Sequence, residues 1–477
     1  MSLWIEGSSP GGRTASLDSY IAGRRVFVVA LIAKAFDMKT TRLPEFVPAA
    51  DEMQTGRIYS FALADGKVVP VSRSDAFLRD VHDHIQLTHP SKLAVLSRLQ
   101  DYPNISALLD TGAVFAELAG RRQQISEWLG EGFHIFGAFK VGLRLARHAR
   151  ALGLEVKGFL DNDPAKQGQL LEGLAIDHPS SAMLENSIVV VASGRHGNAI
   201  SKQLQEVAGI RLVNMHEFLY ALDGPGPGLG SEKFSSFVEA PLLEPWRFIS
   251  AFLRLDDELS RRVYDALIGM RTRLSIAYAQ QVTSPWGEEY FDRAFVRPEH
   301  AARFVDAGAA SGDTLRRLEV KFGQVEQAWL FEPELPAYYE ALKSTADRPN
   351  VWLFNMGLDE VPSRATYHPK LSFDIAGELI SDVPVSITSF IQGVPLDAVV
   401  SDKVGLLKMD IEGMEASALR GARSIIKRDK PTLAVCAYHR SDDYWSLMDE
   451  VNSIRGDYRV GVRLYADILE DIVLYFY

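Results

Sequence analysis

From residue 126 onward, the hydrophobic and polar positions alternate between two kinds of segment. Short apolar runs rich in Val, Ile and Phe are separated by longer stretches in which apolar residues recur every three or four positions. The first pattern is typical of buried strands and the second of amphipathic helices. In the first half of the chain the apolar runs are Phe133–Phe139, Leu154–Asp163, Ser187–Ser193 and Arg211–Met215. This alternation predicts a parallel, doubly wound sheet within residues 126–222.

A second alternation begins at Arg303, within a second predicted domain of residues 301–477. Strands are expected in RFVDAGA, QAWLFEP, VWLFNMG, VGLLKMDIEG and TLAVCAY, with helical segments between them. The last run, YRVGVRLYADILEDIVLYFY, has two β-rich parts around a turn-like centre, which predicts an antiparallel hairpin added to the parallel sheet. The predicted fold class is therefore α/β, with two doubly wound Rossmann-like domains. The second of them carries the terminal antiparallel hairpin.

Glycine and proline mark the boundary between these two parts. In DGPGPGLGSEK, residues 223–233, they remove the hydrogen bonds on which helices and strands depend, which predicts an interdomain linker. The segment 234–300 follows as a helical approach to the second domain. Its clearest helix is LDDELSRRVYDALIGMRTRLSIAYAQQV, where Asp256 and Asp257 suit the N-terminus.

Residues 1–125 form an α+β segment to which the sequence assigns no role. A helix is expected within 105–129, whereas 41–74 mixes short strands and turns. The apolar run Val26–Ala33 follows two arginines, a pattern that a signal peptide has but that a short buried strand also has. We favour the strand and a cytoplasmic protein. No run approaches the ~20 apolar residues of a membrane span, so no membrane association is expected.

Composition narrows the class of protein further. With 477 residues, of which 47% are hydrophobic and 24% charged, the chain is globular and too long for one hydrophobic core. The formal net charge of −11 gives no broad attraction for nucleic acid. Cys436 lies in an apolar run and is expected to be a buried thiol. We expect no metal at His82, His84 and His89, which fit a solvated surface, and a homodimer remains an open alternative to a monomer.

The sequence FVDAGAASGDT places an acidic strand end before a glycine-containing turn and a helix start. Asp306 ends the strand, and Gly308, Ala310 and Gly312 form a turn that a ligand can approach closely. Glu332 ends the next strand, where a carboxylate can accept hydrogen bonds from two ribose hydroxyls. The pattern predicts an adenosine cofactor. The turn lacks the spacing that admits a pyrophosphate, so an adenosine ligand with an amino group fits better.

On these residues the sequence resembles the class I S-adenosylmethionine-dependent methyltransferases, and among them the FkbM-type family. The resemblance covers 304–477 and rests on DAGAASGDT, LFEP, KMDIEGMEASALRGA, AYH and the terminal VLYF, in that order. The preceding LSRRVYDALIGMRTRL and EEYFD also look like that family. Ala310 departs from the family pattern, which has glycine there. The resemblance implies methyl transfer from S-adenosylmethionine, with a hydroxyl on a sugar, glycan or polyketide-like metabolite as acceptor.

The resemblance also implies roles for the cofactor-binding residues. The carboxylate of Asp306 would face the methionine amino end of the cofactor, the backbone from Gly308 to Gly312 would lie beneath it, and Glu332 would hold the ribose. Asn355, after the third strand, would meet the adenine edge. A turn residue that hydrogen-bonds to nearby backbone explains Asn355 equally well.

Three residues near the ends of the fourth and fifth strands are the candidate catalytic groups. Asp410 ends the fourth strand at the edge where such sheets bind ligands. If the strand continued, Glu412 would point to the same side, and the two carboxylates could orient a hydroxyl, act as a base or hold a divalent cation. Glu415 is expected to start the next helix. His439 follows the fifth strand and has an ordinary pKa suited to proton acceptance, although a structural histidine fits as well.

The first Rossmann-like domain offers an alternative function. GAFKVG followed by Asp161 looks nucleotide-binding, but Phe139 stands where a pyrophosphate needs glycine, so tight NAD binding is not expected. The segment resembles Rossmann-like modules of sugar-modifying proteins. An NAD-linked oxidoreductase or a nucleotide-sugar-binding protein acting through residues 126–222 stays open. So does a non-catalytic protein that retains an adenosine pocket.

Overall fold

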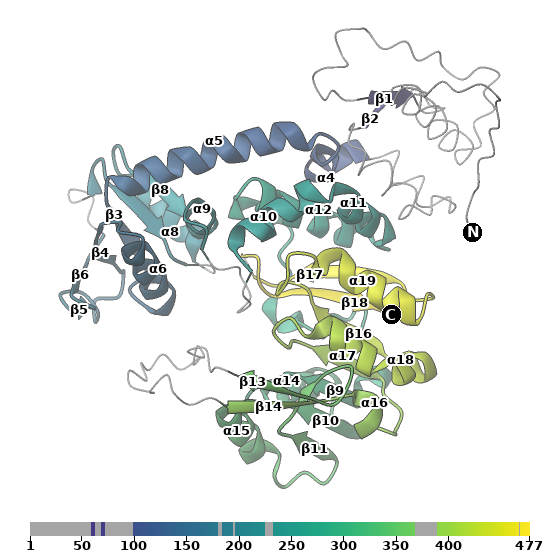
Figure 1. Ribbon diagram of the computed structural model, residues 1–477. Helices are drawn as coiled ribbons and strands as arrows, with labels where there is room; N and C mark the ends of the chain where they lie inside the picture. Colours follow the sequence, from purple (N-terminus) through teal and green to yellow (C-terminus); the bar gives the residue numbers. More distant parts are fainter. Residues whose placement is uncertain are drawn as a thin grey trace, which may run out of the picture. The chain divides into compact units, whose positions relative to one another are not determined.

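The computed structural model describes residues 59–62, 68–71, 99–179, 184–193, 196–224, 232–367, 389–466 and 468–477 (Figure 1). The chain divides into two compact units, Met1–Leu99 and Gln100–Tyr477. In the first unit, β1 (Tyr59–Ala62) and β2 (Val68–Val71) pair antiparallel. The short strands expected in this part of the chain are thereby confirmed.

Three features expected from the sequence lie wholly or partly outside the described residues. The apolar run Val26–Ala33 and the histidines at 82, 84 and 89 are not described, nor are residues 225–231 of the Gly- and Pro-rich linker. The expectations for these segments therefore stay predictions.

Residues 133–214 of the second unit form a parallel sheet in the order β5-β6-β4-β3-β7-β8. Its strands are β3 (Phe133–Phe136), β4 (Val156–Leu160), β5 (Leu170–Leu171), β6 (Leu174–Asp177), β7 (Ile188–Val191) and β8 (Arg211–Asn214). Neighbours pair parallel except for β5, which is antiparallel to β6. All four residues of β7 are buried, as expected for an interior strand of a parallel sheet. The sheet predicted from the alternating pattern is confirmed.

Helices precede and connect these strands. They are α4 (Pro103–Ala107), α5 (Thr111–Gly130), α6 (Lys140–Ala151), α8 (Gly197–Leu204) and α9 (Met215–Ala221). The helix expected within 105–129 is present as α4 and α5. α5 is the longest described helix, with 20 residues, and it carries several charged side chains. Among the described residues, no helix is long and apolar enough to cross a membrane.

The approach segment is helical, as expected. It contains α10 (Phe234–Leu243), α11 (Pro245–Arg254), α12 (Glu258–Thr272), η3 (Ile276–Gln281), η4 (Trp286–Glu288) and α13 (Pro298–Ala301). Asp257 caps α12 by accepting a hydrogen bond from the backbone N–H of Ser260 at 2.9 Å. This confirms one of the two aspartates predicted at the helix start.

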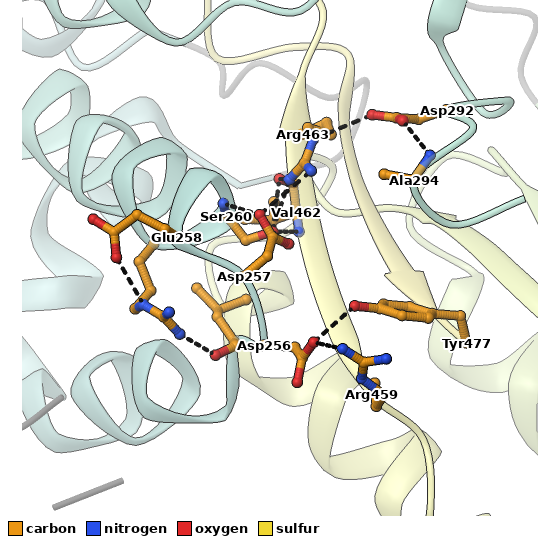
Figure 2. A network of polar contacts seen from close by, with 12 residues as sticks. Asp256, Asp257, Glu258, Ser260, Asp292, Ala294, Arg459, Val462, Arg463 and Tyr477 are labelled. Atoms are coloured by element: carbon orange, nitrogen blue, oxygen red, sulfur yellow. Dashed lines mark hydrogen bonds and ion pairs between the residues drawn. The ribbon is translucent and has the colours of Figure 1, made fainter. Parts of the chain in front are cut away.

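A polar network joins the start of α12 to the terminal hairpin (Figure 2). The Ser260 hydroxyl accepts hydrogen bonds from the backbone N–H of Val462 at 2.9 Å and from the Arg463 side chain at 2.8 Å. Asp256 pairs with Arg459 and accepts a hydrogen bond from the hydroxyl of Tyr477. The approach segment is therefore held against the last strands of the chain.

The second sheet has seven strands in the order β11-β10-β9-β15-β16-β18-β17. They are β9 (Arg303–Ala307), β10 (Gln327–Phe331), β11 (Val351–Phe354), β15 (Leu406–Met409), β16 (Thr432–Cys436), β17 (Val460–Leu464) and β18 (Ile472–Phe476). β18 pairs antiparallel with both β16 and β17, while the other neighbours are parallel. The predicted terminal hairpin and the predicted fold class, with two doubly wound sheets, are confirmed.

The main connecting helices of this sheet follow the expected alternation. They are α14 (Asp313–Phe322), α15 (Leu335–Thr345), α17 (Glu415–Gly421), α18 (Arg423–Asp429) and α19 (Asp443–Ile454). The core between them includes the fully buried side chains of Phe304, Leu330, Leu406 and Tyr475. Cys436 is buried in the same core, as predicted.

The connection from β11 to β15 differs from the prediction of helical segments between strands. Its described residues form a small sheet, β12-β14-β13, from β12 (Gly357–Leu358), β13 (Ser363–Tyr367) and β14 (Ser389–Val394). Only the one-turn helix α16 (Leu396–Val399) follows within the described part of this connection. The sequences SRATY and SFIQGV pair antiparallel, and their aromatic and β-branched residues favour strands.

Candidate functional site

The candidate site lies where the strand order of the second sheet reverses. β9 pairs with β10 on one side and with β15 on the other, and ligands bind at the carboxyl ends of strands at such a point. Gly308 has a φ of +81°, and a Cβ there would lie 1.9 Å from the carbonyl oxygen of Asp410. Glycine is therefore required, because the turns after β9 and β15 touch each other.

Glu332 lies against the glycine turn, as its place in the sequence suggested. Its buried carboxylate accepts hydrogen bonds from the backbone N–H groups of Ala310 and Glu334, both at 2.8 Å. Burial raises the pKa of Glu332, and the two backbone hydrogen bonds oppose this shift. Ala310 has a φ of +43°, a conformation that favours glycine, the residue that the family pattern has there.

Asn355 reaches the same region through its side chain. Its amide Nδ2 donates to the carbonyl oxygens of Glu332 at 3.0 Å and Pro333 at 3.1 Å. The amide nitrogen of Asn355 therefore fixes the backbone that follows β10. These are contacts of the kind that a structural role would require, and the adenine contact stays a prediction.

Asp306 is fully buried beneath the turn and forms an ion pair with Lys408. The two residues face each other in the register of β9 and β15, with 3.0 Å between Nζ and Oδ1. Lys408 also donates to the carbonyl oxygens of Ala307 at 3.2 Å and Gly308 at 2.6 Å. Burial raises the pKa of Asp306 to about 6, although Lys408 opposes the shift. The cation next to Asp306 is thus Lys408, a residue of the protein itself. The contact between Asp306 and a cofactor amino group stays a prediction.

Lys408 was not among the residues singled out from the sequence. Its side chain is buried, and it binds the carboxylate and the two carbonyls that begin the turn. One signal for it was available: VGLLKMD is an apolar strand interrupted by a single lysine. A lysine buried in a strand requires an acidic partner.

Asp410 lies at the carboxyl edge, directly after β15. Its carboxylate accepts hydrogen bonds from the hydroxyls of Tyr290 at 2.9 Å and Tyr438 at 3.2 Å, and its side chain is 24% exposed. Burial would raise the pKa of Asp410, but Lys408 and His439 outweigh it, and the pKa is lowered. Tyr290, from the approach segment, is therefore a partner of the leading catalytic candidate.

His439 lies among carboxylates after β16, with its side chain only 2% exposed. Its Nδ1 is 3.0 Å from Glu415 Oε1, and its Nε2 is 3.4 Å from Asp410 Oδ1 and 3.9 Å from Glu412 Oε2. Burial lowers the pKa of His439, but Glu415, Asp410 and Glu412 outweigh this and raise it to about 10. Three acids surround the ring, so the pKa of His439 lies above the ordinary value from which the sequence analysis argued, and its role as a proton acceptor stays a prediction.

Glu412 and Glu415 occupy different environments. β15 ends at Met409 and Glu412 has a φ of +58°, so strand alternation does not bring Glu412 and Asp410 together. Glu412 is 59% exposed, and its Oε2 lies 3.9 Å from Nε2 of His439. Glu415 is the first residue of α17, as predicted, and its Oε1 accepts a hydrogen bond from the backbone N–H of Ile411 at 2.9 Å.

Residues from outside the second sheet hold the loop that carries His439. Arg271 of α12 donates to the carbonyl oxygen of Ser441 at 2.8 Å, and Glu232 accepts a hydrogen bond from the Ser441 N–H at 3.0 Å. Asp443 accepts hydrogen bonds from the N–H groups of His439 at 3.0 Å and Arg440 at 2.8 Å. The approach segment thus contributes to the position of the candidate catalytic groups.

The corresponding turn of the first sheet is occupied by its own residues. Asp161 accepts a hydrogen bond from the Ala138 N–H at 3.0 Å and pairs with Lys166 at 2.9 Å. Its other oxygen accepts a hydrogen bond from the Asp163 N–H at 2.9 Å. Phe139 is 49% exposed in this turn. The acid that would bind a ribose is therefore engaged by protein donors.

Comparison with known proteins places this geometry in a family. The family model of the methyltransferase FkbM domain matches residues 306–459, from Asp306 through the loop that carries His439. Residues 306–459 are an FkbM methyltransferase domain. The FkbM domain thus contains the glycine turn, Glu332, Lys408 and the carboxylates around His439. Tyr290, Arg271 and the terminal hairpin lie outside the matched residues.

The solved structure of methyltransferase FkbM from Methylobacillus flagellatus KT is similar to this chain in fold. The identity is 24% and the TM-score 0.62, over 81% of this chain and 100% of that one. Residues 234–477 make up about half of the chain, and the match covers 81% of it. The similarity therefore extends into residues that precede the Gly- and Pro-rich linker. No protein of curated function matches the sequence significantly.

Two more distant structures match smaller parts of the chain. Aeropyrum pernix fibrillarin, solved with natively bound S-adenosyl-L-methionine, is 14% identical over 38% of this chain and 69% of its own, with a TM-score of 0.25. A putative rRNA-methylase from Clostridium thermocellum is 12% identical over 41% of this chain and 96% of its own, with a TM-score of 0.26. Both scores are too low to establish a shared arrangement of elements.

Proposed function

We propose that this chain is an S-adenosylmethionine-dependent O-methyltransferase. Its acceptor would be a hydroxyl on a sugar, glycan or polyketide-like metabolite. The observation that carries the proposal is the position of Asp410: its carboxylate is partly exposed and stands at the reversal of strand order, beside the glycine turn. A group at this place adjoins a cofactor on that turn and can receive a proton from an acceptor.

The residues around the turn fit a cationic adenosine cofactor. Backbone N–H groups hold the carboxylate of Glu332 against the turn, and each of its oxygens keeps a lone pair that can accept a hydrogen bond from a ribose hydroxyl. Glu334 and Glu412 add negative charge: burial raises the pKa of Glu334, and the charge of Glu412 raises it further. Because the charges of these two carboxylates repel each other, this edge of the sheet favours a ligand that carries a positive sulfur and an amino group. S-adenosylmethionine, when bound, supplies a methyl group that its positive sulfur makes reactive.

The polar groups near Asp410 favour an uncharged hydroxyl as the acceptor. Two basic residues close to this edge are already engaged, since Lys408 pairs with Asp306 and Arg317 pairs with Glu289 at 3.0 Å. An anionic acceptor would have to compete with those carboxylates. A hydroxyl can instead donate its hydrogen bond to Asp410, as the hydroxyls of Tyr290 and Tyr438 do.

In the proposed reaction, the acceptor oxygen forms a bond to the methyl carbon while the bond from that carbon to sulfur breaks. The hydroxyl proton passes to the carboxylate of Asp410. The remaining residues orient the reacting groups. The turn that begins at Gly308 would hold the cofactor together with Glu332, and the hydroxyls of Tyr290 and Tyr438 hold the carboxylate of Asp410.

The test is transfer of a labelled methyl group from S-adenosylmethionine to a panel of sugars, nucleotide sugars and hydroxylated polyketides. Once an acceptor is found, Asp410→Asn should lower single-turnover transfer ~10²-fold or more, because the charge of the base is lost while its size is kept. Glu360→Gln, at an exposed acid distant in sequence, is the matched control and should leave transfer unchanged. Full transfer by Asp410→Asn would remove Asp410 from the mechanism, and transfer only to amines would refute O-methylation.

A further inference from the structure

Three metal-ligating side chains converge at the carboxyl edge of the second sheet. They come from different elements: Asp410 follows β15, Glu415 starts α17 and His439 follows β16. Each offers a ligand atom that lies within 4.8 Å of those of the other two. Donors around one cation, each at about 2.0–2.3 Å from it, lie at most about twice that distance apart. Small side-chain adjustments would therefore suffice for all three to reach one ion.

A second observation points to a cation at this place. Glu415 is 1% exposed, and its Oε2 has no hydrogen-bond partner among the described residues. Its other oxygen already binds the Ile411 N–H and faces the imidazole of His439. A buried carboxylate oxygen without a donor is costly, whereas coordination to a cation removes that cost.

The charges around His439 agree with this. Asp410, Glu412 and Glu415 surround one imidazole, so the acids outnumber the single positive charge that this ring can carry. Lys408, the cation on the neighbouring strand, is engaged by Asp306 and by two carbonyl oxygens. A divalent ion would balance the excess.

We infer that Asp410, Glu415 and His439 bind a divalent cation. Two carboxylates and one imidazole are a mixed ligand set, which suits first-row ions such as Mn²⁺ and Zn²⁺ better than Ca²⁺. The imidazole must lose its proton to bind the ion, so proton and cation compete for the ring. The partial exposure of Asp410 and the exposure of Glu412 leave one side of the ion accessible to a further ligand.

The role of the ion rests on the proposed function. An acceptor hydroxyl bound to the cation would be more acidic and would be held in a fixed orientation for methyl transfer. Asp410 would then act as a ligand as well as a proton acceptor. The binding of the ion itself does not depend on the identity of the acceptor.

The experiment is a titration of the full chain with Mn²⁺ alone, in which electron paramagnetic resonance measures the concentration of the free ion at each step. We expect one saturable site, with a dissociation constant of ~10⁻⁴ M or tighter. Asp410→Asn and His439→Gln should each weaken binding at least tenfold, because each removes a ligand. Asp457→Asn, at an exposed acid on the surface, is the control and should bind Mn²⁺ as the parent does.

Two outcomes overturn the inference: no saturable binding up to millimolar Mn²⁺, or binding that neither Asp410→Asn nor His439→Gln weakens. Thermal melting of each variant shows whether it is folded, and two ligand variants are used in case one of them does not fold. S-adenosylhomocysteine is titrated into the same samples. If S-adenosylhomocysteine binds and Mn²⁺ does not, the cation site fails while the proposed function stands.

Discussion

Replacing Lys408 by methionine tests the buried ion pair that supports the glycine turn. Methionine keeps most of the apolar length of the lysine side chain but removes its charge and its hydrogen bonds. The change leaves Asp306 without its ion-pair partner and the carbonyl oxygens of Ala307 and Gly308 without a donor. Because the Gly308 turn touches the backbone of Asp410, the change acts on both halves of the candidate site.

The expected loss of stability is large. Removing one partner of a buried ion pair costs ~3–5 kcal/mol, because an uncompensated charge remains in the interior. Asp306 can limit the loss by taking up a proton, since burial raises its pKa to about 6 even when Lys408 is present. We therefore expect a loss near the lower end, ~3 kcal/mol.

The same reasoning fixes the sign of the pH dependence in Lys408→Met. Without the lysine, the pKa of Asp306 in the folded chain should rise further above its unfolded value. The folded state then binds more protons than the unfolded state between these two pKa values, so stability falls as pH rises through that interval. The variant should be less stable at pH 8 than at pH 5, relative to the parent at the same pH.

Urea unfolding followed by tryptophan fluorescence measures the loss. Lys430→Met is the matched control, because Lys430 is a partly exposed lysine paired with Asp457, and its replacement should cost less than ~1 kcal/mol. The double variant Asp306→Leu with Lys408→Met should recover much of the stability, since no buried charge is left unpaired. A loss in Lys408→Met no greater than in Lys430→Met would refute the structural role assigned to the pair.

Three further changes test other parts of the structure. Glu332→Ala should weaken binding of S-adenosylhomocysteine by ~1–3 kcal/mol in a calorimetric titration, through loss of charge-assisted hydrogen bonds, and unchanged affinity would remove Glu332 from the site. Phe139→Gly should not create tight NAD binding, because Asp161 remains bound to Ala138 and Lys166; a low-micromolar dissociation constant by calorimetry would contradict this. Asp257→Ala should lower the free energy of unfolding in urea by ~1–2 kcal/mol, because α12 loses its cap, and a loss below a few tenths would show that other contacts suffice.

The site residues whose positions depend only on the end of a single strand could be predicted from the sequence. Asp306, Gly308 and Glu332 each stand at a fixed place relative to an apolar run, so the pattern of the runs locates them. The same holds for Asp257 at the start of α12. Such positions depend on local backbone geometry, which a short stretch of sequence determines.

The parts that depend on pairing between distant segments could not be predicted in the same way. Lys408 meets Asp306 only because β15 and β9 pair in that register, about a hundred positions apart in the sequence. The pKa of His439 depends on Glu415, which approaches the ring from the start of α17. The contact between Tyr290 and Asp410 could not be predicted for a similar reason, because the hydroxyl of Tyr290 reaches Asp410 from the approach segment.

The central claim is that the FkbM domain uses an adenosine-sulfonium cofactor, and calorimetry tests it most directly. The full chain is titrated with S-adenosylhomocysteine and, in parallel, with NAD. We predict saturable binding of one S-adenosylhomocysteine per chain and no comparable binding of NAD. Tight binding of NAD with no binding of S-adenosylhomocysteine would contradict the account.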